Sequence, residues 1–184
     1  TLVSIMHANN EIGNKNPIKE IAKICKKYDA LFHCDTVQTM GHFPHDVKEI
    51  GFDFLVGSAH KLHGPKGVGF IYVNGDRKID PLMHGGSQER GMRGGTENVS
   101  GIIGMAKALE IAYNQMDEHK RHVTSIKSRM IEQLKEKISG VQFNGNSAEL
   151  DNSLYTVLSV SLPASEISEM LLFNLDIAGI SASG

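Results

Sequence analysis

Short apolar runs, separated by amphipathic or polar stretches, fill the first 73 residues of the chain. Four of these runs have the length of buried strands, and each is bounded by polar or glycine residues. They cover residues 1–8, 30–34, 52–56 and 68–73. The stretches between the first three runs have helical character. Strands that alternate with helices predict an α/β fold with a largely parallel sheet.

Two helices are predicted in this first part of the chain. Asn16-Pro17 is a typical helix start, with asparagine as the N-cap and proline at the first helical position. Ile18, Ala22 and Cys25 then fall on one helical face, so Cys25 is interpreted as a small core residue. Residues 44–50 predict a second, shorter helix. Cys34 lies inside a predicted strand and is given no chemical role.

The second half of the chain is predicted to be mainly helical. An apolar stripe at helical spacing extends from residue 97 to about residue 139, where Gly140 ends it. Such a helix is long enough to join two domains. His119 and His122 lie on its polar stretch, and two histidines without a third ligand nearby favour a solvated face over a metal site. Short strands at 141–143 and 157–162 and a helix at 164–174 follow.

Composition excludes several classes of function. The chain has 184 residues, a net charge of −2 and 40% hydrophobic residues, which is sufficient for a core but gives no basic footprint for nucleic acid. No apolar run reaches membrane-spanning length. Two cysteines make no disulfide framework, so a cytoplasmic location is expected. The chain opens inside an apolar run without a methionine, so we expect it to be part of a longer protein.

The stretch from Gly57 to Gly67 is the strongest candidate for chemistry. It joins two apolar runs and holds Ser58, His60 and Lys61 among glycines and a proline. Loops at strand ends carry the chemistry of α/β enzymes. A lysine held there among small residues loses its proton readily and can form an imine with a carbonyl compound. The alternative is a solvated lysine beside a Gly-Pro turn.

Other polar residues follow the neighbouring strands. Asn10 comes after the first strand, and Asp35 and Gln38 come after the second. Asp35 also suits a helix N-cap, and the two interpretations are compatible. A lysine for an aldehyde, an acid for a pyridine nitrogen, and amide, hydroxyl and imidazole donors for ring and phosphate oxygens are what a pyridoxal phosphate site requires. The candidate set is Asn10, Asp35, Gln38, Ser58, His60 and Lys61.

A long loop at residues 79–96 is rich in glycine and carries two arginines. Glycine lets a backbone approach an anion closely, and a loop of this length is usually functional. A flexible surface loop is the alternative.

Four blocks of sequence give a resemblance to a known family. They are HANNEIG (7–13), HCDTVQTMG (33–41), GSAHKLHGPKGVG (57–69) and MHGGSQERGMRGGTEN (83–98). In their order and spacing they resemble the class V aminotransferase-like, fold-type I enzymes that use pyridoxal 5'-phosphate, and within these the cysteine desulfurases of the NifS/IscS kind. The resemblance implies that residues 1–117 are part of the cofactor-binding large domain and residues 118–184 part of a smaller α+β domain.

The resemblance also implies roles for single residues. Lys61 resembles the lysine that holds the cofactor's aldehyde, and Asp35 the partner of its pyridine nitrogen. Gln38 and Asn10 resemble the residues that contact the cofactor's ring oxygen and the bound substrate. The remaining implied contacts are to phosphate: Ser58 and His60 within the subunit, and Thr96 toward the other subunit of a homodimer.

The implied reaction converts L-cysteine to L-alanine and leaves a persulfide on an enzyme cysteine. Its sulfur would pass to an acceptor or scaffold protein for iron–sulfur cluster assembly or thiolation. The family's persulfide cysteine and carboxylate-binding arginine are expected beyond Gly184, and its ring-stacking histidine before Thr1. The alternatives are selenocysteine lyase, another class V aminotransferase, or an incomplete chain that only folds and dimerises.

Overall fold

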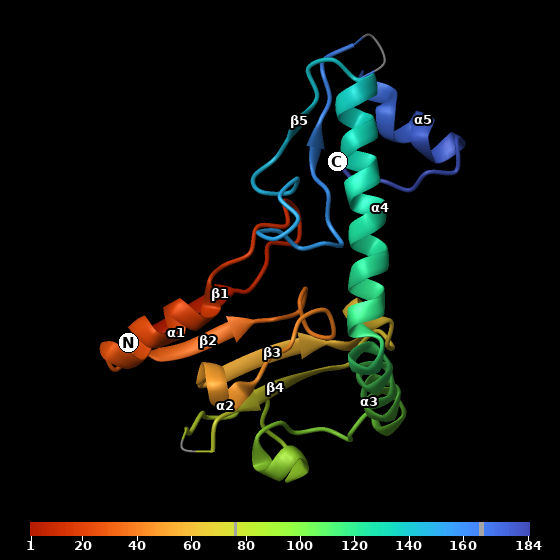
Figure 1. Cartoon of the computed structure of the whole chain (residues 1–184). Coiled ribbons are helices and arrows are strands. Elements are labelled where there is room, and N and C mark those ends of the chain that lie inside the picture. The colour runs from red at the N-terminus through yellow and green to blue at the C-terminus, as the bar shows by residue number, and fades with distance from the viewer. Residues whose placement is uncertain (76, 166–167) are drawn as a thin grey trace.

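A four-stranded sheet forms the base of the molecule in the computed structural model, which describes residues 1–75, 77–165 and 168–184 (Figure 1). Its strands are β1 (Leu2–Met6), β2 (Leu31–Asp35), β3 (Phe54–Ser58) and β4 (Gly69–Val73), in that order. The first three are parallel, and β4 runs antiparallel to β3. Only the loop at 59–68 separates β3 from β4, which is too short for a parallel crossover. The predicted α/β fold with a mostly parallel sheet is confirmed.

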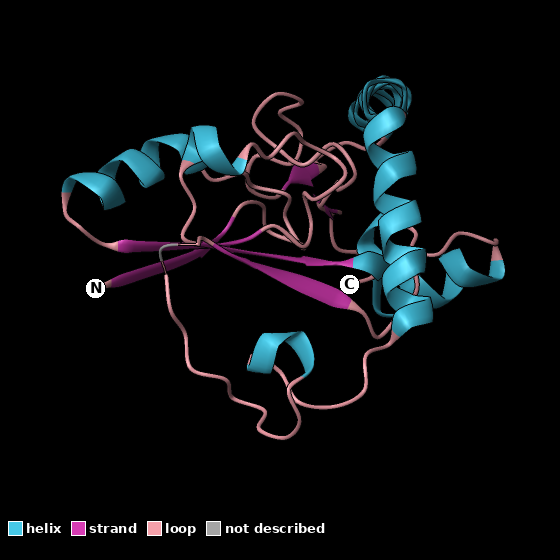
Figure 2. Ribbon diagram, turned by 90° about the horizontal axis from the view of Figure 1, so that it is seen from below, coloured by secondary structure: helices cyan, strands magenta, loops and turns pink. Residues whose placement is uncertain are grey.

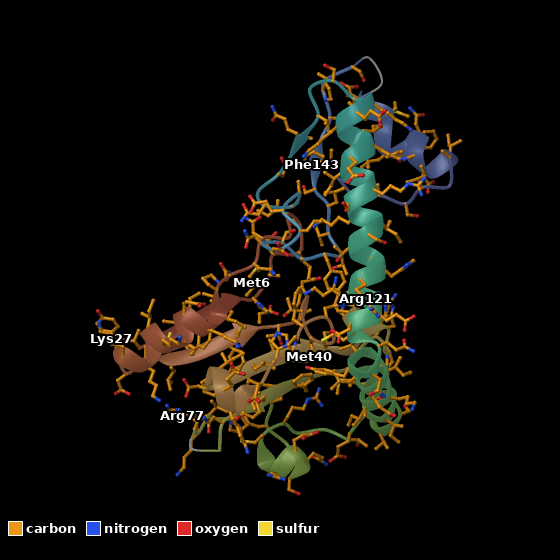
Figure 3. All side chains as sticks on the ribbon, viewed as in Figure 1. Met6, Lys27, Met40, Arg77, Arg121 and Phe143 are labelled. Atoms are coloured by element: carbon orange, nitrogen blue, oxygen red, sulfur yellow. The ribbon has the colours of Figure 1, made fainter. Side chains whose placement is uncertain are left out.

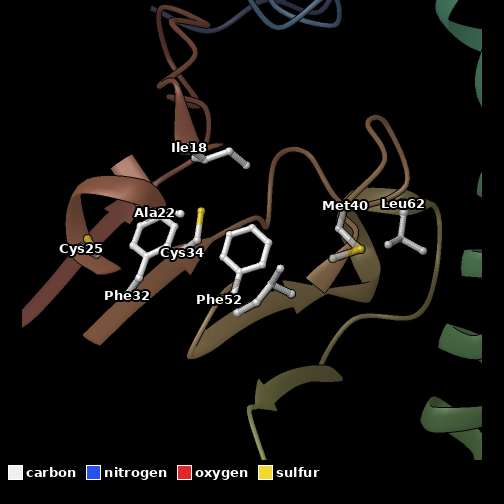
Figure 4. Packing of buried hydrophobic residues seen from close by; sticks show 9 residues of the cluster. Ile18, Ala22, Cys25, Phe32, Cys34, Met40, Phe52 and Leu62 are labelled. Carbon is white, nitrogen blue, oxygen red and sulfur yellow. The ribbon is translucent and has the colours of Figure 1, made fainter. Parts of the chain in front are cut away.

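The core lies between one face of this sheet and two helices, α1 (Ile18–Lys27) and α2 (Val47–Ile50) (Figures 2 and 4). The rings of Phe32 and Phe52 stack at its centre with their centroids 5.6 Å apart. Both cysteines belong to this core, as the sequence predicted. The buried cluster comprises Ile18, Ala22, Cys25, Phe32, Cys34, Met40, Phe52, Leu55 and Leu62.

The opposite face of the sheet is open. Along β1 the exposed side chains are Leu2, Ser4 and Met6, which alternate with the half-buried ones that face α1. On this open side Figure 2 shows the loop that carries the one-turn helix η2 (Gln88–Gly91). Asp35 is on the same side, because it pairs with Met6 in the parallel register.

The start of α1 differs from the prediction. Pro17 occupies the cap position, and no side chain caps this helix. Instead, the Nδ2 amide of Asn16 donates to the main-chain carbonyl of Met6 at 2.7 Å, which ties the loop back to the end of β1. The second helix, α2, begins later than predicted because Asp46 caps it, accepting from two main-chain N–H groups at 2.9 Å.

The helical stretch predicted as one helix is two. Helix α3 (Val99–Asn114) and helix α4 (Met116–Lys137) meet at Gln115, whose φ of −108° and ψ of 5° are not helical. The break has a physical reason, because the two helices pack on different partners. Helix α3 lies against the loop that follows β3, where Gly104 meets Pro65, whereas α4 rises away from the sheet (Figure 1). Among the described residues no helix combines the length and the apolar character needed to cross a membrane.

The last part of the chain lies beside the upper half of α4 (Figure 1). It holds a two-stranded antiparallel sheet of β5 (Gln142–Phe143) and β6 (Val160–Ser161), then the turn η3 (Ser168–Met170) and helix α5 (Leu171–Ile177). The strands predicted at 141–143 and 157–162 are therefore shorter in the structure than in the prediction. The predicted helix at 164–174 starts later and ends later, and its residues 166 and 167 lie outside the described part. The division into domains at residues 117 and 118 stays a prediction.

Candidate functional site

The candidate site lies at the edge of the sheet where the three parallel strands end. The carboxyl ends of parallel strands meet at one edge, which is where α/β folds bind ligands. Asp35 pairs with Met6 on one side and with Val56 on the other. Ser58 lies two residues beyond Val56 on the same face of β3. The register therefore places Asp35 and Ser58 on the open face of the sheet, on neighbouring strands.

Lys61 lies in a single 3-10 turn, η1 (Ala59–Leu62), directly after β3. Ala59 and Leu62 are buried, whereas the side chains of His60 and Lys61 between them are exposed. The turn closes on the carbonyl of Ala59, which accepts from the main-chain N–H of Gly64 at 2.8 Å. Its two buried ends anchor the turn, so it presents the amine of Lys61 at the strand end.

Ser58 and His60 lie together beside this lysine. The Oγ atom of Ser58 is 2.8 Å from Nδ1 of His60. Packing explains the glycine at position 57, just before this pair, because a Cβ there would lie 2.5 Å from the ring of Phe70. The two predicted phosphate ligands thus form one hydroxyl–imidazole pair, held by the close approach of β3 and β4.

Asp35 uses one carboxylate oxygen locally and leaves the other free for a ligand. Its Oδ1 accepts from the main-chain N–H of Val37 at 2.8 Å, as in an Asx turn. No other described residue donates to Oδ2. Gln38 follows in the same turn and is half-buried. The turn itself is anchored by Thr36, whose hydroxyl donates to the carbonyl of Val56 at 2.7 Å.

The two neighbouring asparagines in the loop after β1 differ in their contacts. The Oδ1 atom of Asn9 accepts from the main-chain N–H groups of Glu11 and Ile12 at 2.9 and 3.0 Å, so this residue shapes the loop. Asn10 is exposed and remains available for a ligand. Thr96 is also exposed, but it lies in the segment leading into α3. No hydrogen bond between described residues joins Thr96 to the other six predicted site residues.

Two cavities of about 500 and 380 Å³ lie away from the Lys61 edge of the sheet. One is lined by residues that include Lys15, Phe43 and Asp151, and the other lies at the opposite edge of the sheet, beside Asp29 and Asp53. Asp35, Ser58 and Lys61 lie together at the sheet edge, outside both cavities, and their part in a binding site stays a prediction.

A second group of polar rings lies next to the Lys61 turn, and the sequence did not reveal it. The hydroxyl of Tyr155 is 2.9 Å from Nδ1 of His42 and 3.3 Å from Nδ1 of His119. His63, directly after η1, has its ring centroid 6.5 Å from that of His119. His63 lies inside one of the four sequence blocks and His42 directly follows another, but nothing in the sequence pairs them with His119 or Tyr155, which lie far along the chain. In Figure 3 the labelled residues Arg121, on α4, and Met40, in the turn after β2, mark the two segments that carry His119 and His42.

Burial shifts the pKa values of two members of this group, His42 and Tyr155. It lowers the pKa of His42, and the nearby rings of His119 and His63 lower it further, while a hydrogen bond to the main chain of Lys61 acts in the opposite direction. Burial also raises the pKa of Tyr155 to about 12. The Tyr155 hydroxyl therefore keeps its proton at neutral pH.

The residues at the sheet edge suit a pyridoxal phosphate group by their chemistry. An exposed amine, a carboxylate with one free oxygen and a hydroxyl–imidazole pair lie at neighbouring strand ends. These are the donors and acceptors that an aldehyde, a pyridine nitrogen and a phosphate need. These residues all come from one edge of the sheet, so they form one wall of such a site.

Comparison with known proteins decides the family. Residues 1–183 match the family described as aminotransferase class-V. The chain belongs to this family. Its fold is accordingly the fold-type I architecture, as the sequence predicted.

Relatives of this class-V chain are named cysteine desulfurases. A cysteine desulfurase IscS of Dictyoglomus turgidum is 48% identical over 182 residues, covering 99% of this chain and 45% of the relative. A solved NifS-like protein is 42% identical with a TM-score of 0.90, covering 99% of this chain and 49% of that one. A structure described as SspA in complex with cysteine is 31% identical with a TM-score of 0.72, covering 95% and 47%. The chain spans about half the length of the curated relatives it matches.

Proposed function

We propose that this class-V chain is the central part of a pyridoxal phosphate-dependent cysteine desulfurase. The observation that carries the proposal is the sheet edge where Lys61, Asp35 and Ser58 lie on adjoining strand ends, in a chain whose relatives have that name. The neighbour described as bound to cysteine supports the choice of L-cysteine as substrate. Residues 1–117 would then belong to the large domain and residues 118–184 to the small one.

Each residue of the wall has a role in this proposal. Lys61 would hold the cofactor's aldehyde, and the free Oδ2 of Asp35 would meet the pyridine nitrogen. Gln38 and Asn10 would contact the ring oxygen and the substrate. When bound, the cofactor supplies an electron sink that weakens the bonds around the substrate's α-carbon. The Lys61 amine would move protons at that carbon.

The phosphate would lie against the Ser58–His60 pair, which offers a hydroxyl and an imidazole at one point. Thr96 would reach the phosphate of the other subunit, because it is exposed and has no hydrogen bond to the other residues of its own wall in the described part of the chain. This role requires a homodimer.

The reaction moves sulfur between two thiols. The carbon–sulfur bond of cysteine breaks and a sulfur–sulfur bond to an enzyme thiol forms, while the β-carbon gains the proton that completes alanine. Neither thiol of this chain suits the acceptor role, because Cys25 and Cys34 are buried and burial raises the pKa of Cys34 to about 12. The acceptor would be a cysteine outside this sequence, and its sulfur would pass to a partner protein that builds iron–sulfur clusters or thiolated products.

Lys61→Ala in the full-length protein tests the proposal. We expect alanine formation from cysteine to fall at least about a hundredfold, since the amine that moves the proton is lost. Borohydride reduction of the wild-type protein should add a mass the size of the reduced cofactor to the peptide containing Lys61. Lys66→Ala, at an exposed lysine five positions further on, is the matched control and should keep activity within about twofold.

The alternatives give different results in the same assays. Faster alanine release from selenocysteine than from cysteine would indicate a selenocysteine lyase. Cofactor binding with transamination but no sulfide would indicate another class V aminotransferase. Full activity of Lys61→Ala would refute the proposal. The 184-residue polypeptide alone should form no persulfide, because its two thiols are buried.

A further inference from the structure

Lys127, on helix α4, is a buried lysine that has no part in the proposed reaction. Its side chain is only 5% exposed, whereas a lysine on an amphipathic helix normally reaches solvent. In the described part of the chain no carboxylate pairs with it. Burial, and then the charge of Lys15, lower its pKa to about 8, so the amine is still mostly charged at neutral pH. A buried cation without a counter-charge depends on its hydrogen bonds.

The ammonium group of Lys127 donates to two oxygens of one short segment. Its Nζ atom lies 2.8 Å from Oγ of Ser153 and 3.0 Å from the main-chain carbonyl of Leu154. Both of these residues are buried. The Ser153 hydroxyl donates in turn to the main-chain carbonyl of Glu149 at 2.7 Å. Lys127 therefore fixes the segment around Leu154 to helix α4.

The same segment holds the loop that carries Asn10, which comprises residues 9–14 and is called the Asn10 loop below. The main-chain N–H of Leu154 donates to the carbonyl of Gly13 at 2.7 Å. The loop also closes on itself, because the N–H of Gly13 donates to the carbonyl of Asn9 at 3.1 Å. Leu154 thus has its carbonyl on the Lys127 amine and its N–H on the Asn10 loop.

Close packing around this contact leaves the Asn10 loop little room to shift by itself. Gly13 has a φ of 71°, and a Cβ there would lie 3.3 Å from the Cβ of Val157. A second hydrogen bond ties the loop to the same segment, since Oδ1 of Asn14 accepts from the N–H of Asn146 at 2.6 Å. A shift of the segment is therefore passed on to the loop, because no void between them can absorb it.

A general structural anchor is the competing interpretation of Lys127. In that case the lysine would only attach the last part of the chain to α4, and its loss would weaken the fold as a whole. The direction of the hydrogen bonds favours a more specific role. They run from Lys127 to Leu154 and from Leu154 to Gly13, so they end in the loop of a predicted site residue.

We propose that Lys127 is a positioning residue for Asn10, which acts through Leu154 and Gly13 to fix the loop that presents the Asn10 amide. The value of this positioning rests on the proposed function, in which Asn10 and Gln38 contact the ring oxygen and the substrate. The chain of hydrogen bonds itself concerns only residues of this sequence. It couples helix α4 to the substrate side of the sheet edge.

Hydrogen exchange in the full-length protein tests this link without any reaction. Lys127→Met keeps the length of the side chain and removes its donors, so protection of the Leu154 and Gly13 amides should fall about tenfold or more. The amide of Phe32, which donates to the Asp53 carboxylate at 2.7 Å in the core, should keep its protection. The control Arg129→Met, at an exposed arginine on the same helix, should behave like the wild type.

Two further substitutions separate positioning from general anchoring. Lys127→Arg keeps donors at the end of a long side chain, so protection of both amides should stay within about threefold of the wild type. Lys127→Gln is too short to reach both acceptors, so it should give the loss seen in Lys127→Met, and it serves if that variant fails to fold. Full protection of the Leu154 and Gly13 amides without the lysine, or an equal loss at Phe32, would overturn the proposal.

Kinetics of the holoenzyme supply an independent readout. Lys127→Met should raise the KM for cysteine about fivefold or more and change kcat less, because a displaced Asn10 binds the substrate less well. In an Asn10→Ala background the same substitution should have no further effect on KM, because the contact that it positions is already lost. Independent, multiplicative effects of the two substitutions would show that Lys127 does not act through Asn10.

The two kinds of failure can be told apart. If the wild type binds no pyridoxal phosphate, the proposed function fails, and the exchange data still decide the link from Lys127 to the Asn10 loop. If the enzyme is active but the Leu154 and Gly13 amides do not respond to Lys127→Met, the positioning alone is wrong.

Discussion

His7 and His45 form a half-buried pair of imidazoles behind the turn that follows β2. Nδ1 of His7 lies 3.0 Å from Nε2 of His45 and 3.0 Å from the hydroxyl of Thr39. Burial lowers the pKa of His7 to about 4, with further lowering by His45 and Lys15. Burial likewise lowers the pKa of His45 to about 4, although a hydrogen bond to the main chain of Phe43 opposes it. Both rings are therefore neutral at pH 7.

This pair predicts an acid-sensitive stability. In the unfolded chain both histidines titrate near pH 6.5, so between about pH 6.5 and 4 the unfolded state binds protons that the folded state does not. The free energy of unfolding should fall as the pH drops through this window, by about 1.4 kcal/mol per pKa unit for one ring and by a few kcal/mol in all. Below pH 4 both rings are protonated in the folded and the unfolded state, so this contribution to the free energy of unfolding is gone and no longer changes with pH.

Urea unfolding of the full-length protein between pH 7.5 and 4 measures this slope. His45→Gln should remove a large part of the slope, because it deletes one titrating ring and lessens the repulsion on the other. His122→Gln, at an exposed histidine, should leave the slope as it is. Equal slopes in wild type and His45→Gln would show that the pair is not the cause.

At the scale of single residues, the sequence predicted positions better than contacts. Asp35, Ser58 and Lys61 could be placed at one edge because parallel strands bring their carboxyl ends together. The contact of His42 with Tyr155 could not be predicted, because 113 positions separate them and no local pattern joins them. Lys127 is a similar case. It lies on an amphipathic helix, yet it is buried and donates to Ser153 at 2.8 Å.

Among the elements, the β3–η1–β4 unit determines where Lys61 lies. Its two strands approach so closely that a Cβ at Gly57 would meet the Phe70 ring at 2.5 Å, and one at Gly69 would meet the Gly57 carbonyl at 2.7 Å. Gly57 and Gly69 therefore have a steric reason. They allow the antiparallel pairing that follows the lysine turn, which in turn anchors Ser58 and Ala59.

Gly57→Ala should destabilise the fold by about 1–3 kcal/mol, because the added methyl group must displace the Phe70 ring. The double variant with Phe70→Leu should recover part of that loss, since the smaller side chain makes room. Urea unfolding of both variants gives the coupling between the two positions. Gly75→Ala, where a Cβ meets nothing within 4 Å, is the control. A Gly57→Ala protein as stable as that control would contradict the steric argument.

Long periodic elements were easier to predict than their ends. Strands β1 to β4 and helix α1 follow from apolar patterning, because each places one face against the core. The break at Gln115 could not be predicted, since the apolar stripe continues across it while the packing partners change. The cap of α1 was wrong for a similar reason: Asn16 bonds to Met6, a tertiary partner, in place of the helix N-terminus.

In the molecule as a whole, the two faces of the four-stranded sheet are covered unevenly. Helices α1 and α2 bury one face of the sheet, whereas the other face exposes Leu2 by 56%, Ile71 by 53% and Met6 by 38%. Helix α3 carries a further exposed apolar side chain, Ile103, which is 65% exposed. Sheets that are mainly parallel are normally covered on both faces. Exposed apolar area of this kind tends to bind other apolar surfaces.

The 184-residue polypeptide by itself should therefore bind the dye ANS and associate with itself at micromolar concentration. Light scattering after size exclusion, together with dye fluorescence, measures both effects. Leu2→Thr with Ile71→Thr should lower both, because threonine suits a strand and removes apolar area from the open face. The control is Ile24→Gln, at an equally exposed position on α1, which lies on the other side of the sheet from the open face. It should change dye binding and association little. A monomer that binds no dye would show that the open face does not drive association.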